Sequence, residues 1–217
     1  MKYFLGLLFF FVLKTSLIAQ TATIIKIYSK SPLAKYAAEW NMPIYAECNT
    51  AANEKYLQPK EKEIIYILNL VRVYPKLFAN TVLTKYPKMS DKLELLNDTY
   101  YFKSLLETLR KLEAKPLLFA DKKCYTSAFC HAKSSGKRGY TGHDRLTNEC
   151  EKKSYFNGEC CDYGNDDPLD IVLSLLIDTN VPSLGHRNIL LSSYEKIGVS
   201  FQPHKKYEFS AVIDLHY

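Results

Sequence analysis

The chain has 217 residues, of which 47% are hydrophobic, and its formal net charge is +6. Acidic and basic residues are interspersed, as in Lys60-Glu61-Lys62-Glu63, which is typical of solvated helix faces and argues against a nucleic-acid-binding protein. No Pro/Gly/Ser-rich linker divides the roughly 200 residues that follow the N-terminal leader, a length that can bury one sizeable core, so we predict a single domain.

The first residues have the pattern of a secretory signal. Met1-Lys2 precedes an apolar run, Tyr3 to Leu13, that is too short to span a bilayer. We expect a signal peptide over residues 1–19, although Leu17 also allows a cut a few residues later, and an uncleaved anchor is the alternative. Cleavage predicts a secreted, periplasmic or cell-envelope protein without a transmembrane anchor, and no cysteine follows the run to carry a lipid.

An even number of cysteines in an exported chain favours disulfides, although the sequence alone allows many pairings. The six cysteines are Cys48, Cys124, Cys130, Cys150, Cys160 and Cys161. We expect Cys150 to pair with Cys160 or Cys161, and the other of these neighbours to reach the helix that bears Cys124 and Cys130. This pairing would leave at most two free thiols. A zinc site made of cysteines is disfavoured because the chain has no Cys-x-x-Cys pair.

Residues 20–60 are predicted to form an irregular lead-in packed on the domain. Ile24-Ile25-Lys26-Ile27-Tyr28 is typical of a strand, but three prolines interrupt any longer element. We expect Trp40, the only tryptophan, to pack on the main core and Cys48 to tie the lead-in to it by a disulfide.

Apolar residues at helical spacing predict four helices in the first two thirds of the chain. They are expected over 63–74, over 79–86, over 100–112 and from Asp121 onward, where Asp121 is the predicted N-cap. The last helix carries a narrow stripe of small residues every fourth position. His131 on it is expected to be packed or at the surface, and contact with the site is the alternative. The Gly-rich passage 134–143 is predicted to be a loop that ends at His143.

The last third alternates between strand and helix patterns. Residues 155–161 predict a short strand with Glu159 at its edge. Asp167-Pro168-Leu169-Asp170 combines a cap, a proline at the first helical position and an acidic first turn, and the helix is expected to end near Asp178. The runs 196–201 and 207–215 predict a strand hairpin at the centre of a sheet. Helices first and strands last predict an α+β domain with an antiparallel sheet.

Several short motifs stand in one order along the chain. They are Glu63, Asn69 and Arg72 on one helix, then Gly142-His143, Gly158-Glu159, Gly185-His186-Arg187-Asn188-Ile189-Leu190 and Ile197-Gly198-Val199. Their order and spacing resemble the CAP superfamily, the SCP-like extracellular proteins that include cysteine-rich secretory, antigen 5 and pathogenesis-related 1 proteins. The resemblance begins at about residue 60 and places a CAP domain at residues 61–217.

The resemblance implies a three-layer αβα sandwich, with a central antiparallel sheet between helices, and a cleft lined by two histidines and two acids. His143 is similar to the first cleft histidine, Glu159 to the acid of the family's Gly-Glu-Asn motif, and His186 to the second histidine. Cys160 stands where the family has the asparagine of that motif. Asp178 is the nearest candidate for the fourth member, which is usually a glutamate.

Two neutral imidazoles and two carboxylates suit a divalent cation such as zinc, with His143 and His186 as its ligands, but they could equally form a buried hydrogen-bonded cluster. The resemblance implies an exported, non-enzymatic module that binds a small ligand, such as a lipid or sterol, or a partner at the cell envelope or outside the cell. One alternative is a metal-assisted hydrolase in which Glu159 activates a water, and another is a purely structural tetrad.

Overall fold

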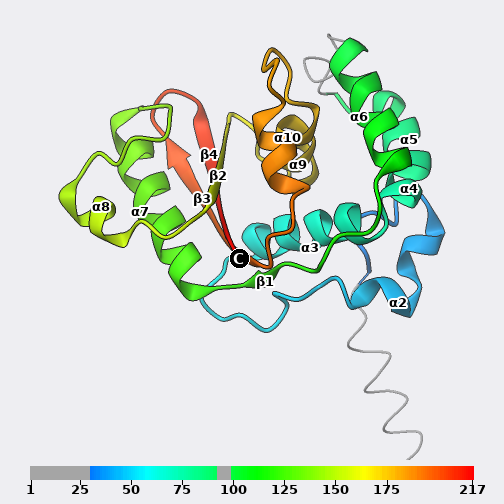
Figure 1. The fold of residues 1–217 in the computed structure, drawn as a ribbon, viewed down its shortest axis with the longest axis horizontal. Helices are drawn as coiled ribbons and strands as arrows, with labels where there is room; N and C mark the ends of the chain where they lie inside the picture. The colour runs from blue at the N-terminus through cyan, green and yellow to red at the C-terminus, as the bar shows by residue number, and fades with distance from the viewer. Residues whose placement is uncertain (1–29, 92–98) are drawn as a thin grey trace, which may run out of the picture.

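The computed structural model describes residues 30–91 and 99–217, and this part of the chain combines helices with a four-stranded sheet (Figure 1). The signal peptide expected over 1–19 and the strand expected over 24–28 lie outside the described residues. Within the described ranges, no helix is long and apolar enough to cross a membrane. The helical segments are η1 (Ala38–Asn41), α2 (Pro43–Ala46), α3 (Pro59–Val73), α4 (Pro75–Phe78), η2 (Ala79–Leu83), α5 (Thr84–Met89), α6 (Thr99–Lys111), α7 (Lys122–Arg138), α8 (Asn148–Lys153), α9 (Pro168–Ile177) and α10 (Gly185–Leu190).

The sheet has the strand order β1-β3-β4-β2. Its strands are β1 (Phe119–Ala120), β2 (Gly158–Tyr163), β3 (Lys196–His204) and β4 (Glu208–His216). β3 and β4 form the predicted antiparallel hairpin, and β2 pairs antiparallel with the other side of β4. β1 runs parallel to β3, so the sheet is mixed and not wholly antiparallel as expected. A parallel pair needs a long connection between its strands, which the chain from α7 to α10 provides.

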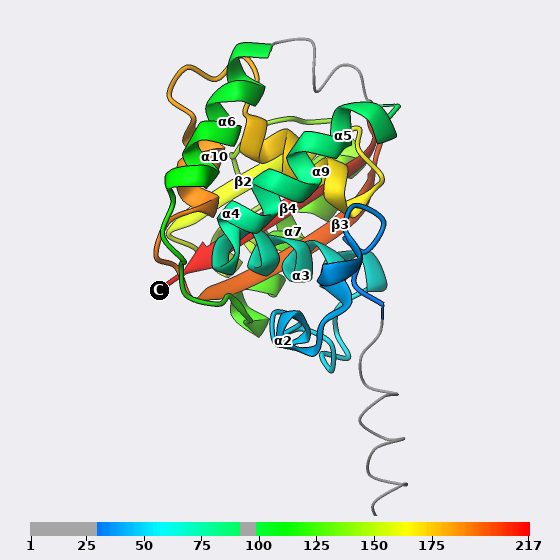
Figure 2. The ribbon, with the colours of Figure 1, turned by 90° about the vertical axis from the view of Figure 1, so that its right-hand side faces the viewer.

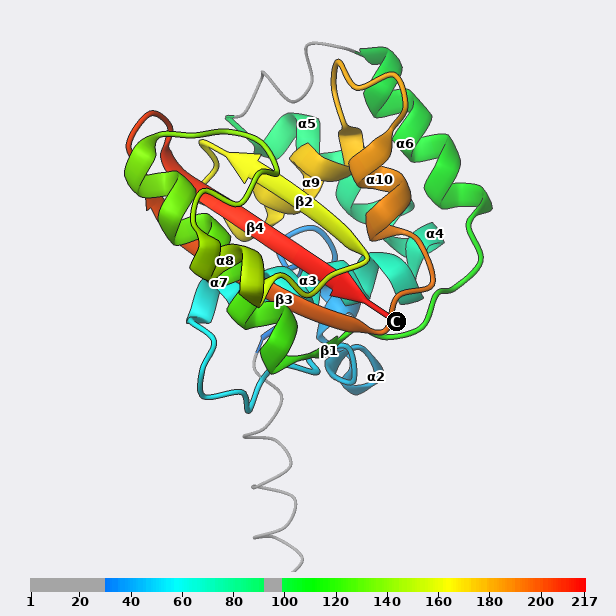
Figure 3. The ribbon, with the colours of Figure 1, turned by 60° about the vertical axis from the view of Figure 1, so that its left-hand side comes forward.

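Helices cover both faces of this sheet, which confirms the α+β class and the helix–sheet–helix layering (Figure 2). α7 lies on one face of β3 and β4, while α3 and α9 pack on the opposite side (Figure 3). A Cβ at Gly198 would stand 2.0 Å from the Tyr125 nitrogen, and one at Gly136 would stand 2.3 Å from the Pro203 oxygen. These glycines therefore allow the backbones of α7 and β3 to touch.

Most helices predicted from periodicity are present. The helices expected over 63–74, 100–112 and 167–178 correspond to α3, α6 and α9. The stretch 79–86 contains the π-helical segment η2 and the first part of α5. α9 begins as predicted, because the Asp167 carboxylate accepts hydrogen bonds from the backbone nitrogens of Leu169 and Asp170.

α7 is longer than predicted. It begins at the expected Asp121 cap but continues to Arg138 and ends at Gly139, whose φ is +70°. The expectation of a loop from residue 134 was wrong, because the helix accommodates both Ser135 and Gly136. The Ser135 hydroxyl donates to the His131 carbonyl at 2.7 Å, and Gly136 makes room for β3. The loop that leads to His143 therefore starts after α7.

The described part of the lead-in is held to the core by packing and hydrogen bonds. Trp40 is buried as predicted, and its indole nitrogen donates to a threonine hydroxyl of η2 at 3.0 Å. The Asn69 side chain on α3 donates to the Cys48 carbonyl at 3.0 Å, while the Cys48 thiol is free. The disulfide expected at Cys48 was therefore wrong, and a buried amide on α3 makes the connection instead.

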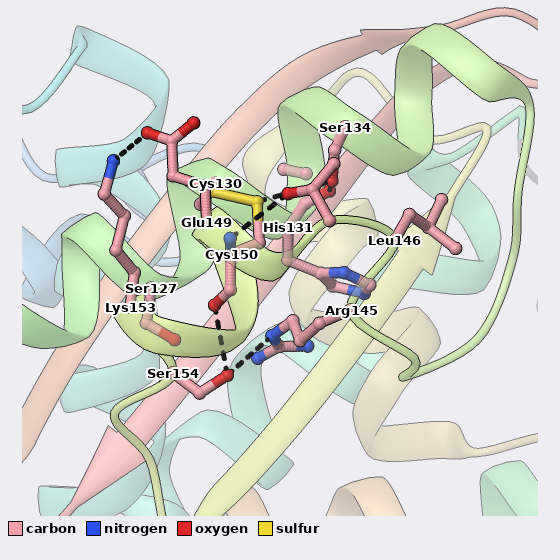
Figure 4. The surroundings of a disulfide bond; sticks show 12 residues. Ser127, Cys130, His131, Ser134, Arg145, Leu146, Glu149, Cys150, Lys153 and Ser154 are labelled. Atoms are coloured by element: carbon pink, nitrogen blue, oxygen red, sulfur yellow. Dashed lines mark hydrogen bonds and ion pairs between the residues drawn. A yellow bond between two sulfur atoms is a disulfide. The ribbon is translucent and has the colours of Figure 1, made fainter.

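The disulfide of the described chain joins α7 to α8 (Figure 4). It links Cys130 to Cys150, with 5.3 Å between their α-carbons. The predicted partners of Cys150 were wrong, because Cys160 and Cys161 are both free and buried in β2. Cys124 is also free, so four described thiols are unpaired where at most two were expected. α8 packs against α7, and this contact decides the pairing.

Candidate functional site

The loop after α7 brings His143 and Arg145 onto Glu159 of β2. His143 Nδ1 lies 2.8 Å from Glu159 Oε1. Arg145 donates from Nη2 to Glu159 Oε2 at 2.6 Å and from Nη1 to Oε1 at 3.1 Å. The Arg145 side chain also donates to the Ser154 hydroxyl at 3.1 Å, so the residue that ends α8 also holds it in place. Glu159 is therefore held from two sides, and both of its oxygens have partners.

Glu159 remains a carboxylate although its side chain is only 2% exposed. Burial alone would raise its pKa, but the hydrogen bonds from His143 and Arg145 and the charge of Arg145 lower the pKa of Glu159 to about 2. Conversely, the hydrogen bond to Glu159 raises the pKa of His143. Because the acceptor is ionised, Nδ1 of His143 must carry the proton of this bond.

His143 stands at the mouth of this cluster. Its side chain is 57% exposed, and among the described residues no hydrogen bond engages its Nε2. With the proton on Nδ1, the neutral ring presents the Nε2 lone pair. The site therefore reaches the surface through one imidazole nitrogen, while Glu159 and Arg145 behind it are shielded from water.

His186 and Asp178 form a second pair of the same kind. Asp178 Oδ1 accepts from His186 Nδ1 at 2.7 Å, and Oδ2 accepts from the backbone nitrogen of His186 at 3.0 Å. Asp178 adopts a left-handed conformation with φ +59° at the end of α9, which turns its carboxylate towards the start of α10. Arg187 is buried and donates to the Leu176 and Ile177 carbonyls at the end of α9, which fixes α10 there.

Strand β2 lies between the two histidine–carboxylate pairs. Glu159 faces α7, because its Oε1 lies 4.0 Å from His131 Nε2, while the Cys160 thiol lies 3.8 Å from the His186 carbonyl. Neighbouring residues of a strand point to opposite faces, so Glu159 and Cys160 point to different sides of β2. β2 is an outermost strand of the sheet, so both pairs lie at its edge. No hydrogen bond or ion pair between described residues joins one pair to the other. That His143, Glu159, Asp178 and His186 share one cleft stays a prediction.

A second group lies behind His143 and was missed in the sequence. His131, Glu159 and Cys161 each offer one ligand atom, and these atoms lie within 4.8 Å of one another, so the group could hold a metal ion. Strand alternation already places Glu159 and Cys161 on one face, but only the packing of α7 brings His131 to them. Arg145 disfavours a metal ion here, because its guanidinium group already neutralises Glu159 and donates hydrogen bonds to both carboxylate oxygens. Burial also raises the pKa of the Cys161 thiol well above its usual value, which keeps it protonated.

Asp214 on β4 completes the buried cluster and was also missed. It lies directly across from Glu159 in the β2–β4 pairing and is fully buried. Its carboxyl interacts with the side chains of Ser127 and Glu159, and the nearest cation is Arg145 at 3.8 Å. Burial, followed by the charge of Glu159, raises the pKa of Asp214 well above its usual value. Arg145 thus neutralises Glu159 beside an uncharged second carboxyl.

No protein-family model, curated protein or solved structure matches this chain. The resemblance to the CAP superfamily therefore depends on the order of the motifs in the sequence.

Proposed function

We propose that the protein is an exported, non-enzymatic binding module of the CAP type that holds a divalent cation, zinc, through His143 and His186. The observation that supports this most is that both histidines donate from Nδ1 to a buried carboxylate, at 2.8 Å and 2.7 Å. A carboxylate behind the imidazole fixes the tautomer and strengthens Nε2 as a ligand, and metal-binding histidines commonly have this support. Both side chains are also accessible, with exposed fractions of 57% and 26%.

The resemblance suggests what the module binds besides the ion. In the CAP superfamily the same cleft takes lipids or sterols in some members. We therefore propose a small ligand of this kind, or a partner at the cell envelope or outside the cell. Nucleic acid is disfavoured by the interspersed charges.

The geometry favours binding over hydrolysis. A metal-assisted hydrolase would need Glu159 as a general base with a pKa near the working pH. Its pKa of about 2 and its two hydrogen bonds to Arg145 make it a weak base that is turned away from solvent. The thiols of Cys160 and Cys161 are poor nucleophiles because burial raises their pKa values. Binding by the two imidazoles requires none of these groups to react.

Thermal unfolding with zinc and with a chelator tests the proposal. Zinc at a hundredfold excess over its Kd should stabilise the wild type by about 2.7 kcal/mol. His143→Ala and His186→Ala should lose this gain, whereas His216→Ala removes a partly exposed histidine outside the site and should keep it. If the pairs are only structural, His186→Ala should instead destabilise the protein by about 1 to 3 kcal/mol whether or not zinc is present.

Cys161→Ser separates the two places where an ion could bind. Loss of the zinc effect in Cys161→Ser, with His186→Ala unaffected, would place the ion at the inner group with His131. Equal melting temperatures of the wild type with zinc and with chelator would contradict a metal site altogether.

A further inference from the structure

A hollow between the start of α7 and the end of α8 gathers four lysines. Its volume is about 320 Å³, and Lys122 and Lys123 line it from α7 while Lys152 and Lys153 line it from α8. The remaining lining residues carry hydroxyl groups, and none of them is acidic. The Thr126 and Ser154 hydroxyls already donate to the backbone carbonyls of Lys122 and Cys150, so the donors left for an oxyanion are mainly the ammonium groups.

Most of this positive charge has no carboxylate partner in the described structure. Lys153 forms an ion pair with Glu149, but no ion pair between described residues involves the other three lysines. Lys122 lies over the Tyr56 ring at 4.1 Å and the Tyr125 ring at 4.6 Å, and Lys123 lies over the Tyr155 ring at 5.3 Å. A ring face stabilises an ammonium group without neutralising it. The hollow therefore keeps a net positive charge that attracts an anionic ligand.

The walls of the hollow are held in position before any ligand arrives. The Cys130–Cys150 disulfide fastens α8 to α7, as Figure 4 shows. On the floor, the Tyr155 ring stacks on His216 at 4.3 Å, with 4° between the ring planes. The backbone nitrogen of Tyr155 also donates to the Ser127 hydroxyl on α7 at 3.1 Å. A site that is already ordered loses less entropy on binding.

We propose that this hollow binds a small phosphate or sulfate ester. A tetrahedral oxyanion, doubly charged in a phosphate monoester above about pH 6 and singly charged in a sulfate ester, matches the ammonium groups on two walls. The volume is at the lower end of the range for small-molecule pockets. The lysines are the source of the attraction, because the first backbone nitrogens of α7 already donate to Asp121. The hollow adjoins the Glu159 cluster through Ser154, which accepts from Arg145, but none of the proposed zinc ligands lines it.

Calorimetric titration of the full chain, at low ionic strength and with chelator present, tests the site. The probes are inorganic phosphate, glucose 6-phosphate and glucose 6-sulfate. We expect a Kd of roughly 1 mM or tighter for at least one ester. Lys123→Ala/Lys152→Ala should weaken binding about tenfold or more, while Lys123→Arg/Lys152→Arg should keep most of it. The matched control, Lys88→Ala/Lys103→Ala, removes the same charge from exposed positions on α5 and α6 and should change the Kd less than about twofold.

The two esters also separate the sources of the oxyanion. Phosphate gains its second charge near pH 6, so a phosphate site should bind more tightly at pH 8 than at pH 5.5, whereas sulfate affinity should not change for this reason. Tight binding of either ester supports the proposal. Three outcomes would overturn it: no binding of either ester, an equal loss in the control variant, or binding of only a long polyanion such as heparin, which would indicate a diffuse basic surface.

Discussion

The buried pair of Glu159 and Arg145 predicts a specific dependence of stability on pH. The pKa of Glu159 falls from 4.5 to about 2 in the folded protein. Because the folded value is the lower one, this stabilisation is fully present above pH 4.5 and is lost as the pH falls towards 2. The lowered pKa of Glu159 therefore contributes a few kcal/mol to the free energy of unfolding at neutral pH. The side chain is 2% exposed, so solvent screening reduces this value little.

The variant Glu159→Gln removes this carboxylate, and with it one of the charges that raise the pKa of Asp214. It keeps the shape of the side chain but cannot ionise, and it leaves the buried Arg145 with a weaker acceptor. We expect the variant to be less stable than the wild type by a few kcal/mol at pH 7, and the gap to close between pH 4.5 and pH 2. Urea unfolding at a series of pH values measures this, with the fluorescence of the buried Trp40 as the signal.

The control is Glu149→Gln, which removes a carboxylate from an exposed pair. Lys153 lowers the pKa of Glu149 too, but the Glu149 side chain is 73% exposed, so its removal should have little effect at any pH. A gap between wild type and Glu159→Gln that stays constant from pH 7 to pH 2 would refute the reasoning, because Glu159 would then not titrate with a lowered pKa.

Three further predictions concern the scaffold. Gly198→Ala should destabilise the protein by about 3 kcal/mol or more in thermal unfolding, since its Cβ would stand 2.0 Å from a backbone atom of α7; Gly185→Ala, where the nearest contact is 3.5 Å, should be tolerated. Cys130→Ser/Cys150→Ser should lower stability by about 3 kcal/mol in urea unfolding without changing the fold. Thiol counting on unfolded, unreduced protein should find the four described free cysteines. A count of six reactive thiols would exclude the disulfide.

The sequence alone determined the elements whose signals are local. The spacing of apolar residues predicted α3, α6 and α9, and the Asp167 cap predicted where α9 begins. Alternating strand residues around a short polar turn predicted the β3–β4 hairpin. These signals depend on residues a few positions apart, which is why they can be recognised without knowing the rest of the fold. The CAP resemblance and the exported location remain predictions.

Tertiary structure decided which distant side chains meet. Residues 160 and 161 point to opposite faces of β2, and neither pairs with Cys150, because α8 packs on α7 and brings Cys130 to it. Arg145 has no motif of its own, and its role appears only when the loop after α7 folds onto β2. In the sequence, Asp214 is one residue of an otherwise apolar strand. Only the pairing register of β2 and β4 places it opposite Glu159. Disulfides and buried charges require close approach between elements, and that approach is set by packing over the whole domain, which no short stretch of sequence encodes.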